Sequence, residues 1–119
     1  MKCLIFVKAT TDSENGAMPG KEMLAAMGHF NDDLIKAGIM KDADGLKPTS
    51  HAKRVRFSGA DRLVIDGPFS PISEQVAGYW IWDVKSMDEA VEWLKRCPNP
   101  MLIDSEIEIR PAYAASDFE

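Results

Sequence analysis

The sequence predicts an α+β protein, a ferredoxin-like sandwich with an added hairpin strand. Strand-like and helix-like patterns follow one another in the order strand, helix, strand pair, strand, helix, strand. The first strand and the strand before the second helix are central in this topology, and both runs, residues 3–7 and 78–84, are apolar on both faces. Two helices can cover only one face of the sheet, so we expect a second copy of the chain to cover the other.

The N-terminal half contains one strand and one helix. Residues 3–7 are continuously apolar and form the first strand. Residues 9–20 lack periodicity and are rich in turn formers, which predicts a loop long enough to act as a lid. Residues 21–37 form a helix that Gly38 ends. Its apolar stripe is Met23, Met27, Phe30 and Leu34.

The second half begins with a turn-rich connection over residues 42–48. Two short strands follow, residues 53–57 and 63–65, and the Gly-containing loop between them predicts a hairpin. Ser86-Met87-Asp88-Glu89 has the pattern of a capping box, in which the Ser and Glu side chains satisfy backbone donors at a helix start. Residues 106–110 form the last strand.

Length, charge and cysteine content limit the class of protein. The 119 residues fit a single domain, residues 1–119, with a net charge of −5 that disfavours a nucleic-acid partner. The most basic run, Lys53-Arg54-Val55-Arg56, is more typical of a solvated edge strand. Cys3 and Cys97 do not have the spacing of a disulfide framework or a zinc site. The apolar run at residues 3–7 is too short for a signal peptide or a membrane span, so we expect a cytoplasmic protein with no membrane partner.

Asp66 and Glu74 are candidate catalytic carboxylates. They flank a turn at a strand end, and loops at strand ends commonly carry catalytic residues. If burial separated their pKa values, one could act as an acid and the other as a base. In the alternative interpretation, Asp66 is a turn residue that hydrogen-bonds the backbone near Gly67, and Glu74 is a solvated loop residue.

Tyr79 is the third candidate, as a proton donor or acceptor beside those carboxylates. Tyr79 points to one face of its strand, and Trp80 and Trp82 point to the other. For these aromatic residues, packing in the core or in a dimer interface is the ordinary role, and stacking on a ligand is the alternative. His29 and Asp33 have the i, i+4 spacing of two metal ligands, but no third ligand is evident, so we expect no metal. No dinucleotide fingerprint is present, and we expect no cofactor.

Short motifs occur in a fixed order along nearly the whole chain. They are Met27-Gly28-His29-Phe30-Asn31, Gly45-Leu46-Lys47-Pro48, Asp66-Gly67-Pro68-Phe69, Glu74-Gln75, Gly78-Tyr79, Asp88-Glu89-Ala90, Glu92-Trp93 and Glu108-Ile109-Arg110-Pro111. In this order they resemble the DGPF branch of the YCII-related proteins. The resemblance implies a dimeric ferredoxin-like α/β barrel with a small-molecule pocket. That branch commonly has Ala-Glu-Thr-Lys-Glu after the Phe, and only the final Glu, Glu74, is kept here.

Two functions are consistent with these features. The first is a small-molecule lyase or isomerase in a homodimer, with Asp66 and either Glu74 or Tyr79 transferring protons, by analogy with related barrels. The second is a non-catalytic ligand-binding or regulatory protein. The resemblance supports the second through a link to alternative sigma factors, whose genes often neighbour those of the DGPF branch.

Overall fold

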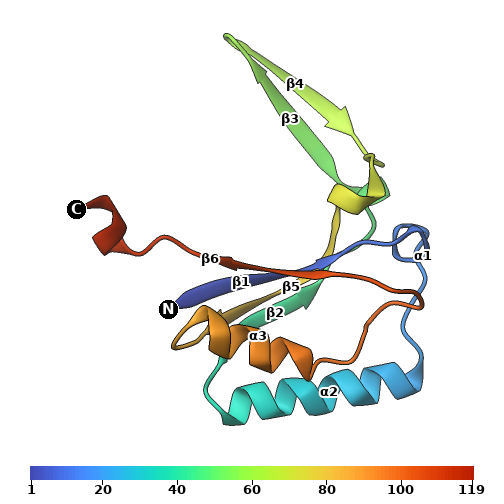
Figure 1. Cartoon of the computed structure of the whole chain (residues 1–119). Coiled ribbons are helices and arrows are strands. Elements are labelled where there is room, and N and C mark those ends of the chain that lie inside the picture. Colours follow the sequence, from blue (N-terminus) through green and yellow to red (C-terminus); the bar gives the residue numbers. More distant parts are fainter.

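The computed structural model describes all 119 residues and contains one antiparallel four-stranded sheet, helices packed on one face of it, and a separate two-stranded hairpin (Figure 1). The strands and α-helices are β1 (Lys2–Lys8), α1 (Thr11–Glu14), α2 (Lys21–Lys36), β2 (Met40–Gly45), β3 (Lys53–Ser58), β4 (Asp61–Asp66), β5 (Val76–Asp83), α3 (Met87–Lys95) and β6 (Ile107–Pro111). Three short 3-10 helices are η1 (Thr49–His51), η2 (Ile72–Glu74) and η3 (Ala115–Phe118). The predicted α+β class is confirmed, and the arrangement is consistent with a ferredoxin-like fold.

The strand order of the sheet is β2-β5-β1-β6. β1 and β5 are therefore the central strands, as their apolar composition on both faces predicts. Each pairs antiparallel with both of its neighbours. The sheet is open in this chain, with β2 and β6 at its two edges.

The edge strand β2 was missed by the sequence prediction, which assigned residues 42–48 to a turn-rich connection. Its segment Met40–Gly45 pairs with β5, and the register shifts between Met40 and Asp42. The shift is a β-bulge, in which one extra residue stands opposite the partner strand. The bulge interrupts the alternation of apolar and polar residues, and Asp, Lys and Gly are depleted in strands, so the strand signal is weak.

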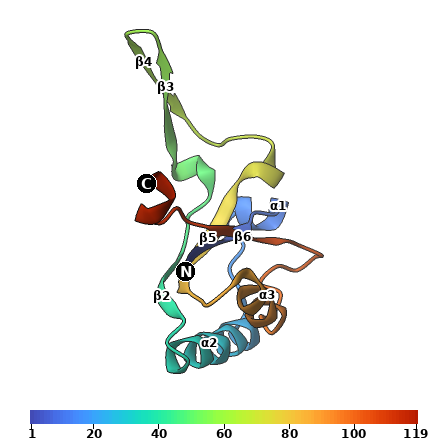
Figure 2. The same ribbon diagram turned by 60° about the vertical axis from the view of Figure 1, so that its left-hand side comes forward.

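The β3–β4 hairpin is confirmed, but the prediction that it adds a strand to the sheet is wrong. Its two strands pair only with each other, from Lys53 opposite Asp66 to Ser58 opposite Asp61. Gly59, with φ of +58°, supplies the left-handed conformation that the tight turn needs. Both views show the hairpin rising on the side of the sheet opposite α2 and α3 (Figures 1 and 2).

The core lies between the sheet and the helices α2 and α3. It consists of Cys3, Ile5, Val7, Phe30, Leu34, Ile39, Trp80, Trp82, Val84 and Ala90. The ring of Phe30 meets that of Trp80 edge-on, with centroids 6.0 Å apart. The indole Nε1 of Trp80 donates to Asn31 Oδ1 at 2.9 Å. Trp82 is completely buried against these groups, so it faces the helices of its own chain and not a partner.

The helices largely follow the sequence signals. α2 ends one residue before the predicted position, and Gly38 follows it with φ of +74°. At the start of α3, Ser86 Oγ accepts from the Glu89 N–H at 3.1 Å, whereas the Glu89 carboxylate accepts from Lys85 and not from Ser86. Only half of the predicted capping box therefore forms. The predicted loop over residues 9–20 contains the single turn α1. None of the helices is long and apolar enough to cross a membrane.

Candidate functional site

The sheet face away from α2 and α3, here called the open face, carries an apolar patch in its centre. Leu4 and Phe6 of β1 stand opposite Ile81 and Tyr79 of β5. All four side chains are half-buried, and α2 and α3 lie on the other face of the sheet (Figure 1). The central strands are thus apolar on both faces, as predicted, and the open face is the surface available to a ligand or a second copy.

The bulge in β2 places two carboxylates beside this patch. Because of the register shift, Asp42 stands opposite Ile81 and Asp44 opposite Tyr79, while Ala43 turns toward the core. In a regular strand starting from Met40 opposite Trp82, residue 42 would point into the core. The bulge therefore brings both carboxylates to the same face as the phenol of Tyr79.

Tyr79 is the centre of this polar group. Its hydroxyl donates to Asp44 Oδ2 at 3.2 Å, and Asp42 Oδ2 lies 3.5 Å from the same oxygen. Desolvation raises the pKa of Tyr79 above its ordinary value, and the hydrogen bonds and negative charges of Asp44 and Asp42 raise it further. Tyr79 is thus held as a neutral phenol with a proton to donate, next to carboxylates that can accept one.

The structure does not join Asp66 and Glu74 to Tyr79. Asp66, the last residue of β4, forms an ion pair with Lys53, and its side chain is 75% exposed. The burial that would separate the pKa values of Asp66 and Glu74 is therefore absent at Asp66 in the single chain. Glu74 lies exposed in η2. No hydrogen bond or ion pair links either carboxylate to the other or to Tyr79, and their catalytic roles stay predictions.

Asp42 and Asp44 are the site residues that the sequence prediction missed. A signal for them exists in the spacing of Asp42-Ala43-Asp44, because residues two apart in a strand point to the same face. Recognising it requires the knowledge that this segment is a strand. The bulge before Asp42 hides that fact.

A second polar cluster, here called the hairpin anchor, holds the base of the hairpin to α1. The Glu14 carboxylate accepts from the N–H of Thr49 at 3.1 Å and from its hydroxyl at 2.5 Å. The Thr49 hydroxyl oxygen in turn accepts from the Phe69 N–H at 3.0 Å. A Cβ on Gly67 would lie 1.7 Å from the Thr49 carbonyl oxygen, so only glycine fits here. The Asp66-Gly67-Pro68-Phe69 motif thus has a structural role at the anchor.

Gln75 extends the anchor toward the hairpin strands. It is buried, and its amide nitrogen donates to the Pro71 carbonyl at 3.1 Å. Its amide oxygen accepts from Arg54 at 3.4 Å, and the Arg54 guanidinium lies 3.8 Å from the centre of the Phe69 ring. These contacts give both polar atoms of the buried Gln75 amide a partner within the chain, which indicates a structural role for this cluster.

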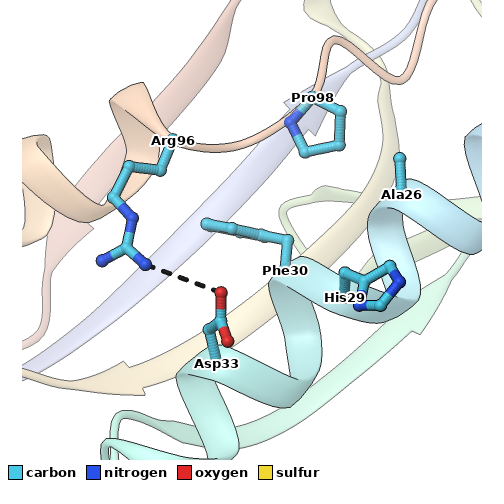
Figure 3. Close-up of a pocket in the computed structure, with 6 residues that line it drawn as sticks. All are labelled: Ala26, His29, Phe30, Asp33, Arg96 and Pro98. Carbon is cyan, nitrogen blue, oxygen red and sulfur yellow. Dashed lines mark ion pairs between the residues drawn. The ribbon is translucent and has the colours of Figure 1, made fainter.

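A shallow groove of about 410 Å³ lies between α2 and the end of α3 (Figure 3). Its lining residues are Ala26, His29, Phe30, Asp33, Arg96 and Pro98. Asp33 forms an ion pair with Arg96 at 3.6 Å and none with His29. No three His, Cys, Asp or Glu side chains are grouped to hold a metal ion. Cys3 and Cys97 are both free thiols, and burial raises the pKa of Cys97 to about 11.

Comparison with known proteins agrees with the sequence motifs. Residues 1–112 match the family model of the YCII-related domain. An uncharacterised protein of Rhizobium meliloti (strain 1021) is 32% identical over 77 residues, which is 65% of this chain and 62% of the relative. The match thus spans less than two thirds of that relative's length. Because the family model covers nearly the whole chain, this protein belongs to the YCII-related family.

Proposed function

We propose that two copies of this chain pack through their open faces and enclose a small-molecule site in which Tyr79 and Asp44 transfer protons, as in a lyase or an isomerase. The observation that carries the proposal is the hydrogen bond from the Tyr79 hydroxyl to Asp44 beside the apolar patch. A neutral donor and a carboxylate in contact form the minimal pair for general acid–base chemistry.

The surface of the single chain supports a dimer. Only 15 of 119 residues are buried. The radius of gyration is 16.3 Å, whereas about 13 to 14 Å is typical of a compact domain of this length. The apolar patch of the open face would be covered by the same patch on a second copy, because a two-fold axis brings identical surfaces together. Covering the face would also remove water from Tyr79 and Asp44, which strengthens their electrostatic effect on a bound substrate.

The chemistry that fits this pair is abstraction of a proton next to a carbonyl group. The Asp44 carboxylate would take the proton from the substrate carbon, while the Tyr79 hydroxyl turns to the carbonyl oxygen and stabilises the enolate. Return of the proton to another carbon completes an isomerisation, and departure of a leaving group from the adjacent carbon completes an elimination. Because its pKa is raised, Tyr79 keeps its proton at neutral pH and can serve as a hydrogen-bond donor to the enolate oxygen.

The branch of the family is part of the same proposal. The Asp66-Gly67-Pro68-Phe69 motif supports membership of the DGPF branch, and its Gly and Phe both take part in the hairpin anchor. Within the dimer, Asp66 and Glu74 are the alternative carboxylates, because a second copy could approach them.

The test is a turnover screen with matched variants. Wild-type protein is incubated with a panel of small carbonyl compounds in deuterated water, and mass spectrometry detects deuterium incorporation or elimination. Tyr79→Phe and Asp44→Asn should each reduce turnover by roughly a hundredfold or more. Asp66→Asn and Glu74→Gln serve as controls with the same loss of charge elsewhere.

The variants separate the alternatives. Turnover that survives Tyr79→Phe and Asp44→Asn but is lost in Asp66→Asn would move the chemistry to the sequence-predicted carboxylates. Binding of a panel compound without any turnover would favour the non-catalytic, regulatory function.

A further inference from the structure

We propose that the β3–β4 hairpin is an arm that lies against the body of a second copy of this chain. The inference rests on the proposed dimer and adds a second contact surface to it. Every residue of both strands is exposed in the single chain. Five of them are large and apolar, namely Val55, Phe57, Leu63, Val64 and Ile65.

Such exposure is unusual for a free hairpin. The Phe57 side chain is 72% exposed and Val64 is 65% exposed. An isolated two-stranded hairpin is marginally stable in water, and a contiguous apolar patch on a projecting element marks an interaction surface. Val55 stands directly opposite Val64 in the hairpin, and Phe57 is the next residue of β3 on the same face.

The direction of the hairpin identifies the side from which the partner approaches. Both views show it rising from the end of the sheet on the side away from the helices (Figures 1 and 2). The open face points to the same side. A second copy seated on the open face would therefore lie beside the hairpin.

The hairpin anchor fixes that direction before any partner binds. Glu14 holds Thr49 in η1, and Thr49 holds Phe69 just after β4. Both ends of the hairpin are thus tied to the body through side-chain hydrogen bonds. An arm held in place loses less conformational entropy when it docks than a flexible loop does.

The charge of the hairpin favours a second copy of the chain as its binding partner. The hairpin carries the cations Lys53, Arg54, Arg56 and Arg62 and the carboxylates Asp61 and Asp66, a net charge of +2. Because the whole chain has a net charge of −5, the body outside the hairpin carries −7. A basic, partly apolar arm is therefore complementary to the acidic body of another copy. The carboxylates among the arm's cations disfavour a phosphate backbone as the alternative.

The experiment compares hairpin variants with a control at another exposed apolar residue. Phe57→Ser and Val64→Ser remove apolar surface from the arm without changing charge. Leu102→Ser is the control, because Leu102 is 84% exposed and lies outside the hairpin. Sedimentation equilibrium measures the dimer dissociation constant, and amide hydrogen exchange measures protection in β3 and β4.

We expect each hairpin variant to raise the dissociation constant by about tenfold or more, which corresponds to about 1.4 kcal/mol. The same variants should lose amide protection in β3 and β4, while Leu102→Ser behaves as wild type. All three should keep the wild-type circular dichroism spectrum, because the substituted side chains are exposed in the single chain.

An unchanged dissociation constant in both hairpin variants would overturn the arm. In that case, dissociation of the dimer by Phe6→Asp on the open face would support a dimer formed by the open faces alone, without a contact from the hairpin. A monomeric wild-type protein would overturn both proposals, so the two failures are distinguishable.

Discussion

The Tyr79 hydroxyl oxygen lies 3.2 Å from a carboxylate oxygen of Asp44, its partner across the β5–β2 pairing. This contact depends on the bulge between Met40 and Asp42, which brings the two side chains to the same face of the sheet. The bulge, a local irregularity of the backbone, thus produces the contact between Tyr79, the candidate acid, and Asp44, the candidate base.

Replacing Asp44 should lower the pKa of Tyr79 toward its ordinary value. Asp44→Asn removes a negative charge that favours the protonated phenol and replaces a hydrogen bond to a carboxylate by a weaker one to a neutral amide oxygen. The chain has two tyrosines, so the titration is followed by the ultraviolet absorbance of tyrosinate in a Tyr113→Phe background. Asp83→Asn serves as a control on the neighbouring part of β5. An unshifted titration in Asp44→Asn would contradict the contact.

The raised pKa also predicts how stability depends on pH. Tyr79 holds its proton more tightly in the folded state, so its contribution is fully present below the unfolded pKa of about 10. That contribution is lost as the pH rises through the higher pKa of the folded state. Urea unfolding at alkaline pH should therefore show a smaller loss of stability in Tyr79→Phe than in wild type.

Truncation of Trp82 should lower the stability of the fold, whereas truncation of Ile81 should weaken the dimer, because these neighbours point to opposite faces of the sheet. Trp82 is completely buried in the core, so Trp82→Ala should destabilise the fold by about 3 to 5 kcal/mol, and Trp82→Asp should prevent folding. Ile81→Ala should change the fold of the single chain much less and weaken the dimer instead. Urea unfolding and sedimentation measure the two effects. A folded, monomeric Trp82→Asp protein would place Trp82 at the interface.

Replacing Glu14 should destabilise the hairpin anchor, whereas replacing the nearby Asp12 should not. Glu14→Ala leaves the N–H and hydroxyl of Thr49 without their acceptor, at a cost of about 1 to 3 kcal/mol. Asp12→Ala in the same turn removes an exposed carboxylate and is the control. Hydrogen exchange at the amides of Thr49 and Phe69 should accelerate only in Glu14→Ala. Equal exchange in both variants would argue against the anchor.

Asp66→Asn should have little effect on the stability of the single chain. The ion pair with Lys53 is exposed on both sides, and such pairs contribute less than about 1 kcal/mol. Urea unfolding of Asp66→Asn, Lys53→Gln and the double variant measures the coupling between them. A loss well above 1 kcal/mol would show that Asp66 is buried in the protein in solution.

The parts of the fold that depend on local pattern could be predicted from the sequence. The continuous apolar runs give the central strands β1 and β5, and the spacing of Phe30 and Leu34 with Gly38 gives α2. The hairpin follows from two short strand-like runs on either side of the loop that contains Gly59. In each case the signal lies within one segment, and tertiary packing agrees with it.

The missed features depend on relations between segments. β2 pairs through a bulge that no local pattern reveals, and without β2 the carboxylates of Asp42 and Asp44 cannot be placed beside Tyr79. Asp66 is exposed and ends a hairpin that pairs with no other strand, and the base of that hairpin contacts α1 through Glu14 and Thr49, which are 35 residues apart in the sequence. Neither the β2–β5 pairing nor the contact between Glu14 and Thr49 can be predicted from the helix or strand propensity of a single segment.

The central claim is that a second copy covers the open face and the Tyr79–Asp44 pair. Light scattering at micromolar concentration tests it most directly. We predict a mass twice the 13.2 kDa of the chain for wild type and a shift to the single-chain mass for Phe6→Asp, which places a carboxylate in the apolar patch. A wild-type protein with the mass of one chain would contradict the claim.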